Sequence, residues 1–268
     1  MADNVVPFPQ RGGRRHHQTG VDEPTPSGGR LRRGTEPPDD LRSGLGFDYE
    51  DHERTRSATI RATGRGSETP ELTYQTGRKF GVDDEGLVKG RALFGWFGRA
   101  DERIGAMRFE EWHPSPGLPG DEFVEAMDEL SLASHNLSLV LADAWEMEEL
   151  SESGPILEFS RLWVHPGHSK GSVWAPLVEA LIRRRYEKRF SILVLKAFPL
   201  EYEDAMGKGS PLERGFAARR QKAMERLYAR LLGVRPLPSD HGAEGWMWRP
   251  LREGAPCPLQ RSKVRPRW

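Results

Sequence analysis

The clearest alternation of hydrophobic and polar positions begins near residue 91 and predicts a β-hairpin followed by a helix. The stretch 92–110 reads as two strands joined by a short polar turn. Glycines and prolines in residues 113–120 then break the chain, and Asp121 is placed to cap a helix. Apolar residues recur at helical spacing over 123–141, with a weak point at residues 134–136.

The second half of the chain alternates between strand-like and helical patterns. An unbroken apolar run near residue 195 is typical of a strand that is buried on both faces. Pro176 falls in the first turn of a helix, where its missing N–H is tolerated, and Gly233 follows a helix as a C′ glycine. The predicted elements are a strand over Ile156–Val164, a loop over His165–Ser172, a helix over Val173–Arg185, a strand over Ser191–Phe198, a loop over residues 199–215, a helix over Ala217–Leu232, and closing strands over Val234–Leu237 and Gly245–Arg249.

These patterns divide the chain into four parts. Residues 1–46 hold almost no large apolar side chains, so a disordered arm is predicted: it is either a basic arm that touches a partner or a mixed-charge tail with no fixed role. Residues 47–90 form an ambiguous, partly ordered lead-in with strand-like alternation at 58–63 and 72–74. Residues 91–251 form the main domain, and residues 252–268 form a basic, flexible tail.

Composition narrows the functional classes. The 40 Lys and Arg balance 40 Asp and Glu, so net charge gives no argument for binding nucleic acid or acidic lipid. The single cysteine, Cys257, rules out an internal disulfide and fits a reducing compartment. No apolar run approaches the ~20 residues of a membrane-spanning helix, and the N-terminus lacks the apolar core of a signal peptide. We therefore expect a soluble, cytoplasmic protein.

Two sequence blocks carry a resemblance to a known family. RLWVHPGHSKGSVWAPLVEALI (residues 161–182) is similar to the strand, pyrophosphate loop and following helix of GNAT (GCN5-related N-acetyltransferase) domains. RLYARLLGVRPL (residues 226–237) looks like a later helix of that family, in which a Tyr precedes a Leu–Gly ending. The resemblance implies an α/β domain, with a mixed, mostly antiparallel central sheet and helices on both faces.

A narrower resemblance is to the autoinducer synthase and long-chain N-acyl amino acid synthase branch. LEFSRLWV (residues 157–164) contains a Glu–x–Ser–Arg motif like that of the branch, and IGAMRF (104–109) followed by GLP (117–119) is similar to its Gly-x-x-Arg strand and Gly–Leu–Pro segment. The branch's N-terminal Arg, Trp and Asp signature is not found here.

The resemblance implies an acyl donor, which would be acetyl-CoA, a longer acyl-CoA or an acyl carrier protein, and a small-molecule or protein amine as acceptor. In the family, a strand edge pairs with the pantetheine arm, and loop N–H groups at a helix N-terminus hold the pyrophosphate. The residues placed there are Trp163, Val164, His168, Ser169, Lys170, Gly171 and Ser172. The family's Arg/Gln-x-x-Gly-x-Gly/Ala loop becomes His168-x-x-Gly171-x-Val173, so one of its three positions is kept.

Glu158, Arg161 and Tyr228 are the candidates for the chemistry, and Glu158 and Tyr228 each have a structural alternative. Glu158 in mid-strand could be a general base with a pKa raised by burial, or it could form an ion pair with Arg161 or Arg108. Direct pairing with Arg161 would require a bulge, because residues three apart face opposite sides of an ideal strand. Tyr228 could protonate a departing thiolate, or it could be an amphipathic side chain on a helix face.

Other conspicuous residues favour structural interpretations. His165 and His168 are too few to predict a metal site, and none is predicted. Lys170 is either the cation for a pyrophosphate or a solvated loop residue. The basic cluster at 183–189 has a single interleaved aromatic residue and is not expected to bind nucleic acid. Trp246 and Trp248 either belong to the hydrophobic core or line an acyl pocket. Two functions remain: an N-acyltransferase, favoured by Glu158, Arg161 and Tyr228, and a non-catalytic binding module on the same fold, favoured by the altered loop.

Overall fold

A computed structural model of the chain describes residues 56–61, 70–99, 102–165, 168, 171, 173–198, 211–238 and 240–260. The predicted arm at 1–46 and the predicted cofactor-loop residues Ser169, Lys170 and Ser172 lie outside the described residues, as do residues 261–268 of the predicted tail.

Over the described residues the chain forms nine strands with helices between them. The strands are β1 (Arg56–Arg61), β2 (Glu71–Thr76), β3 (Phe80–Gly81), β4 (Val88–Arg99), β5 (Glu102–Pro114), β6 (Ile156–Val164), β7 (Ile192–Lys196), β8 (Arg235–Pro236) and β9 (Trp246–Pro250). The helices are α2 (Gly120–Asp128), α3 (Leu132–Ala144), α4 (Met147–Ser153), α5 (Trp174–Leu181), which continues as a π-helical turn η3 (Ile182–Tyr186), α7 (Pro211–Leu232) and α8 (Asp240–Ala243).

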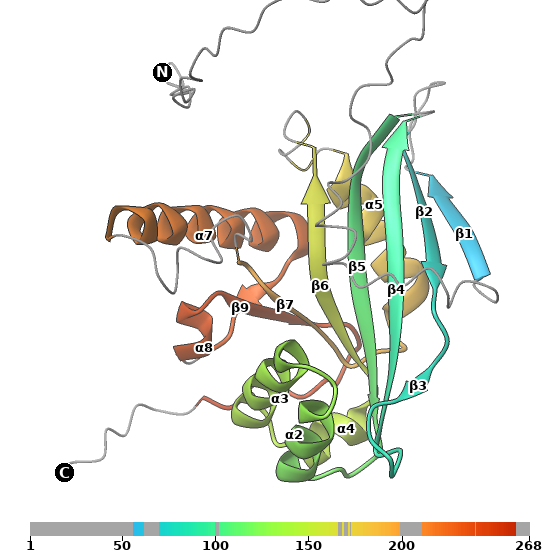
Figure 1. The fold of residues 1–268 in the computed structure, drawn as a ribbon, viewed down its shortest axis with the longest axis vertical. Coiled ribbons are helices and arrows are strands. Elements are labelled where there is room, and N and C mark those ends of the chain that lie inside the picture. The colour runs from blue at the N-terminus through green and yellow to red at the C-terminus, as the bar shows by residue number, and fades with distance from the viewer. Residues whose placement is uncertain are drawn as a thin grey trace, which may run out of the picture. The chain divides into compact units, whose positions relative to one another are not determined.

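All nine strands belong to one open sheet (Figure 1). The order is β1-β2-β4-β5-β6-β7-β9-β8, and β3 pairs with β4 off this path. The β6–β7 pair is parallel, whereas the other paired strands run antiparallel. The predicted α/β class with a mixed, mostly antiparallel sheet is therefore confirmed.

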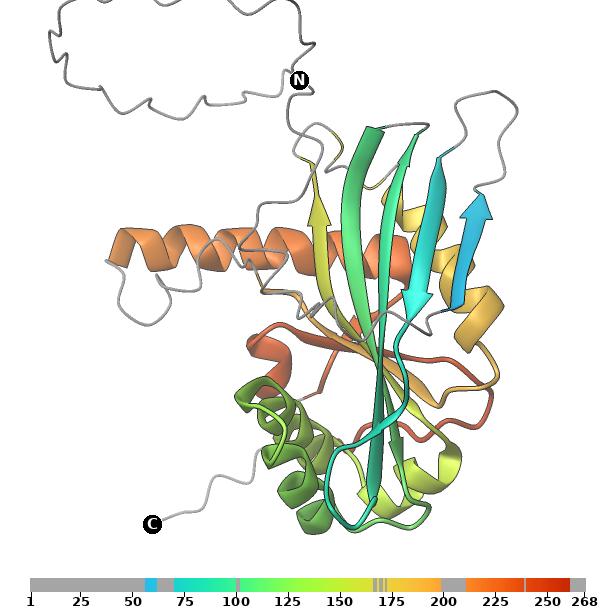
Figure 2. The ribbon, with the colours of Figure 1, turned by 45° about the vertical axis from the view of Figure 1, so that its right-hand side comes forward.

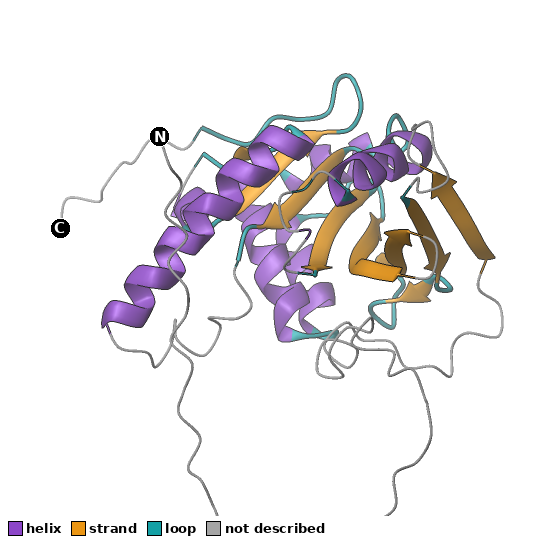
Figure 3. Ribbon diagram, turned by 90° about the horizontal axis from the view of Figure 1, so that it is seen from above, coloured by secondary structure: helices purple, strands orange, loops and turns teal. Residues whose placement is uncertain are grey.

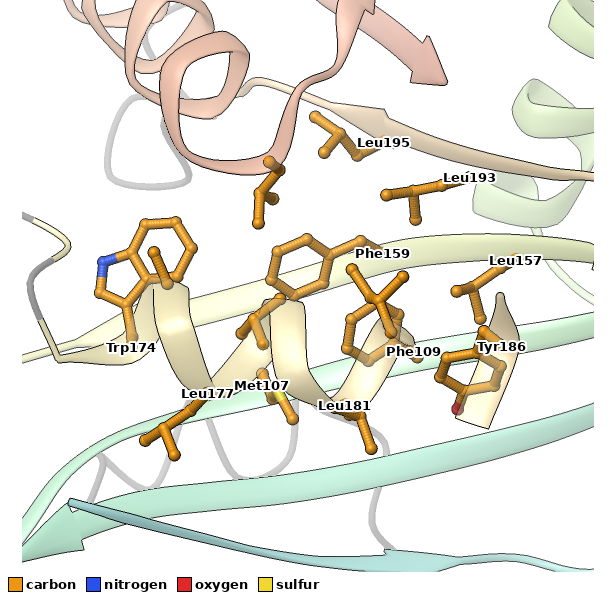
Figure 4. Close-up of a cluster of buried hydrophobic side chains, with 14 of the residues drawn as sticks. Met107, Phe109, Leu157, Phe159, Trp174, Leu177, Leu181, Tyr186, Leu193 and Leu195 are labelled. Carbon is orange, nitrogen blue, oxygen red and sulfur yellow. The ribbon is translucent and has the colours of Figure 1, made fainter. Parts of the chain in front are cut away.

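Two hydrophobic clusters cover the two faces of the sheet, and seen from above, helices stand on both sides of the strands (Figure 3). On one face, α5 and α7 pack over Phe109, Phe159 and Leu195, and Figure 4 shows Trp174 and Leu177 of α5 reaching this cluster. On the other face, α2, α3 and α4 cover the lower ends of the strands around Trp112, Ile156 and Trp248. We call these the α5 face and the α3 face.

The strand-like alternation of the ambiguous lead-in is real, since residues 56–61 and 71–76 form β1 and β2 of this sheet. The first helix differs from the sequence prediction. Asp121 does not cap it, because α2 starts at Gly120 with Pro119 at the N-cap, two residues before the predicted cap. The break predicted at 134–136 lies before α3 instead, where the Ser131 hydroxyl accepts the backbone N–H of Ser134 at 3.1 Å and caps the helix.

The C-terminal elements follow the predicted order with shifted boundaries. Helix α7 begins at Pro211, six residues before the predicted start, and ends before Gly233, whose φ of 65° suits a C′ glycine. Beyond β9 the chain contacts α3 and the residue that follows it: the Trp145 indole N–H donates to the carbonyl of Pro256 at 3.0 Å, and the N–H of Leu259 donates to the carbonyl of Ala144 at 2.8 Å. Part of the predicted tail is thus packed against the domain.

Candidate functional site

A bulge in β6 brings the two charged residues of the Glu–x–Ser–Arg motif to one face of the sheet. Glu158 pairs with Glu110 of β5 and Arg161 pairs with Arg108, while Ser160 has no partner in this register. The Ser160 hydroxyl donates to the carbonyl of Arg108 at 3.2 Å, which ties the extra residue to the neighbouring strand. The bulge that sequence reasoning required for Glu158 and Arg161 to share a face is therefore present.

Glu158 lies in a setting that resists ionisation. Its carboxylate accepts the indole N–H of Trp112 at 3.1 Å, while the guanidinium of Arg108 forms its ion pair with Glu110. Burial, together with the negative charge of Glu110, raises the pKa of Glu158 from its ordinary value of 4.5 to about 7, against the opposing influence of Trp112, Arg108 and Arg161. A carboxyl group with a pKa near 7 can exchange a proton at neutral pH.

The parallel strands β6 and β7 separate beyond Phe159, the residue after Glu158. Their pairing covers Ile156 to Phe159 of β6, and β7 then continues alongside β9. Figure 2 shows β6 running upward with β5 while β7 turns away. Among the described strands, residues 160–164 of β6 thus pair on one side only. Trp163 and Val164, which sequence reasoning placed on this edge, form its upper end with Trp163 toward the α3 face and Val164 against the α5-face core.

In the loop after β6 the described residues are His165, His168 and Gly171, and the glycine is explained by packing. His168 donates its backbone N–H to the carbonyl of His165 at 2.8 Å, and the two imidazole rings lie 6.1 Å apart. Gly171 is buried with a φ of 84°, and a Cβ built there would come within 2.3 Å of the Leu231 side chain in α7. Val173 is buried in the core at the N-terminus of α5.

Tyr228 approaches the same stretch of β6 from the opposite face. It is 7% exposed, and its ring centroid lies 6.4 Å from that of Phe159 and 6.1 Å from that of Trp174. Phe159 follows Glu158 on β6 and points to the α5 face. The structure therefore places Tyr228 and Glu158 at one level of the strand but on opposite sides of the sheet.

Other candidate residues take structural positions. Trp246 and Trp248 belong to the α3-face core, where Trp248 packs edge-on against Trp145 with centroids 5.5 Å apart. In the basic cluster, Arg185 is bound to Glu111, whereas Arg183 and Arg184 are exposed.

Comparisons with protein-family models, with curated proteins and with solved structures found no match to this chain. Within the described part, no helix has the length and apolar composition needed to cross a membrane. Among the same residues, no group of three or more His, Cys, Asp or Glu side chains is placed to hold a metal ion.

Sequence reasoning missed Glu110 and Trp112, the residues in closest electrostatic contact with Glu158. Both alternate with Arg108 along β5 and share its face. This alternation was visible in the sequence, but the Glu110–Glu111 pair offered a carboxylate to each face. The register with β6 was needed to decide which of the two lies beside Glu158.

Proposed function

We propose that the domain is an acyltransferase of GNAT type, which moves an acyl group from acyl-CoA or an acyl carrier protein to an amine. The observation that carries the proposal is the position of Glu158, a carboxyl group with a pKa of about 7, where the parallel strands β6 and β7 part. A carboxyl group with a pKa near 7 is partly ionised at neutral pH, and its ionised form is a stronger base than an ordinary carboxylate. It can therefore accept a proton from an amine nucleophile.

The arrangement of strands supports this choice. The series β6, α5, β7, α7 and β8 follows the order strand, loop, helix, strand, helix ending in Gly and strand on which the resemblance rests, and β9 lies between β7 and β8 in the sheet. The one-sided edge of β6 over residues 160–164 offers backbone groups to an extended ligand such as a pantetheine arm. A thioester bound along this edge would lie beside Glu158.

In the proposed reaction the amine nitrogen attacks the thioester carbonyl carbon while Glu158 accepts a proton from that nitrogen. The tetrahedral intermediate then collapses, the carbon–sulfur bond breaks, and Tyr228 donates its proton to the departing thiolate; because Tyr228 and Glu158 lie on opposite sides of the sheet at one level of β6, the thioester would have to lie at the open edge of β6, between the two faces. Arg161 is the cation beside the base, and its charge favours the ionised form of Glu158. The products are an amide and a free thiol.

The first test is binding followed by turnover. Acetyl-CoA, a long-chain acyl-CoA and free CoA are each titrated while the melting temperature is measured; a donor raises it in proportion to its differential binding to the folded state. With that donor and a panel of amines, Glu158→Gln should lower the rate by roughly 10²–10⁴-fold. Tyr228→Phe should cause a smaller loss, because a thiolate leaves with little help.

Glu179→Gln is the matched control, because Glu179 is also a partly buried carboxylate bound to an arginine, Arg249, with a shortest contact of 3.0 Å, on the α5 face. It should keep the parental rate per folded molecule. A fully active Glu158→Gln protein would remove Glu158 from the mechanism.

The alternative is a binding module on the same fold without the chemistry, and one observation favours it. Gly171, the one position of the family's phosphate-loop pattern that is kept, is accounted for by its φ of 84° and its contact with Leu231, with no ligand needed. If none of the three CoA compounds shifts the melting temperature and no amine is acylated, this alternative gains support.

A further inference from the structure

Glu110 and Glu158 are like-charged residues placed directly opposite each other in adjacent strands. They are register partners in the antiparallel β5–β6 pair, and Glu110 is 7% exposed. Cβ atoms in such pairs lie about 5 Å apart, and like charges at this position destabilise a sheet. Because the Glu110–Glu158 pair lowers the stability of the folded protein, its presence needs an explanation other than folding.

The rest of this row supplies no compensating charge. Ala92 of β4 pairs with Glu110, and Val194 of β7 pairs with Glu158. The row below holds Gly90, Trp112 and Ile156, so Trp112 contributes a hydrogen bond but no charge. Among the described strands, the cations of the adjacent row are Arg108 and Arg161, while Lys196 of β7 lies over the rings of Phe198 and Trp246.

Of these cations, Arg108 is committed to Glu110 by a close ion pair through its Nε. Glu110 therefore acts on Glu158 in two ways: its own charge repels a second carboxylate, and it forms the ion pair with Arg108, a cation whose charge also acts on Glu158. We propose that Glu110 is a positioning residue for the proposed acyl transfer, which keeps Glu158 free of an ion pair and able to exchange protons at neutral pH. This inference rests on the proposed function only for its use in catalysis.

The pKa shifts agree with this geometry. Burial raises the pKa of Glu110 against the opposing effect of Arg108, and the charge of Glu110 is the second cause, after burial, of the raised pKa of Glu158. If Glu110 were neutral, Arg108 could turn to Glu158 and the pKa of Glu158 would fall toward its ordinary range.

The decisive measurement is the titration of Glu158 itself, by ¹³C NMR of side-chain carboxyl groups in the full-length protein. The Glu158 signal is assigned by its loss in Glu158→Gln. In Glu110→Gln its midpoint should fall by about one pH unit or more. Glu110→Asp, which keeps the charge, should retain most of the parental midpoint, and Glu179→Gln, on the opposite face, should leave it unchanged.

Glu110→Thr is the second uncharged variant, with a side chain suited to a strand, and the same fall is expected if Glu110→Gln does not fold. An unchanged or raised midpoint in the folded uncharged variant overturns the inference, because a residue that only supports the fold would not move the titration of Glu158.

Kinetics separate this inference from the proposed function. In an active enzyme the acidic limb of kcat/KM against pH should move down by the same amount as the NMR midpoint in Glu110→Gln. A shifted midpoint in a protein that acylates no amine supports the role of Glu110 and counts against acyl transfer. Acyl transfer with an unshifted midpoint keeps the function and rejects the role of Glu110.

Discussion

Glu111 and Glu110 are neighbours in sequence with opposite surroundings. Glu111 is 0% exposed on the α5 face, where it accepts hydrogen bonds from Arg91 Nε at 2.6 Å and Arg185 Nη2 at 3.0 Å. Burial alone would raise its pKa, but nearby His113 and the charges of Arg185 and Arg91 outweigh burial and lower the pKa from 4.5 to about 2. Glu111 is paired with two arginines and is structural, whereas Glu110 is paired with Arg108 and faces a second carboxylate, Glu158.

The lowered pKa of Glu111 and the raised pKa of Glu158 predict opposite pH dependence of stability for Glu111→Gln and Glu158→Gln. A lowered folded pKa means that Glu111 contributes stability above its unfolded pKa of about 4.5 and loses it as pH falls toward 2. At pH 7 Glu111→Gln should cost on the order of 3 kcal/mol, the free energy that corresponds to lowering the pKa from 4.5 to about 2. The deficit should shrink steadily in urea unfolding curves recorded from pH 5 to pH 2.

For Glu158 the sign reverses. Its folded pKa is raised to about 7, so the parent protein loses stability as pH rises from about 4.5 through 7, and Glu158→Gln does not. The variant should therefore gain stability relative to the parent across that interval. A Glu111→Gln deficit that is constant with pH, or a Glu158→Gln difference that does not change, would contradict these assignments.

At the level of elements, the sequence predicts what depends on local pattern. The apolar alternation of β6 and the glycine after α7 are local signals, and both elements form as expected. The bulge at Ser160 depends on β5, and the π-helical turn at Ile182–Tyr186 accompanies the docking of Arg185 and Tyr186 beside Glu111, which lies far away in the sequence. In the same way, Glu158 was found as a carboxylate in mid-strand, but the role of Glu110 depends on register.

The junction between the β6–α5 loop and α7 allows a direct test of why Gly171 is retained. Gly171→Ala should destabilise the protein by about 1–3 kcal/mol, because its φ of 84° is strained for an L-residue and a Cβ would meet Leu231 at 2.3 Å. Gly86→Ala is the matched control, since Gly86 has a φ of 72° and a Cβ added there would meet nothing within 4 Å. The excess cost at Gly171 measures the contact with Leu231.

The double variant Gly171→Ala with Leu231→Ala should cost less than the sum of its parts, measured by urea unfolding as a coupling energy. Binding of the donor that stabilises the parent is measured on the same folded samples. Normal binding by a destabilised Gly171→Ala protein would assign this glycine to packing alone. Weakened binding with unchanged stability would instead restore it to a phosphate-binding role.

At the level of the whole molecule, the sheet separates the Glu111 network from the Glu110–Glu158 pair, with Tyr228 as the one proposed catalytic residue on the α5 face. The α5 face carries the aromatic core and the Glu111 network, whereas the α3 face carries Glu110 and Glu158 above the helices that cover its lower end. A substitution on the α5 face should thus affect stability first. The two ends of the chain also differ. Residues 255–260 contact the α3 region. The sequence of residues 1–46 lacks the apolar pattern needed for packing.

Two truncations should therefore behave differently. Deleting residues 1–46 should change the melting temperature by no more than ~1 °C, because the sequence of that stretch has no apolar periodicity. Ending the chain after Gly254 should lower stability by about 1–3 kcal/mol, since the buried indole N–H of Trp145 loses the Pro256 carbonyl and the Ala144 carbonyl loses the Leu259 N–H. A chain that ends after Gln260 keeps both contacts and serves as the control. Calorimetry on all three proteins measures the differences, and a cooperative loss of structure on removing residues 1–46 would place part of the folded core within that arm.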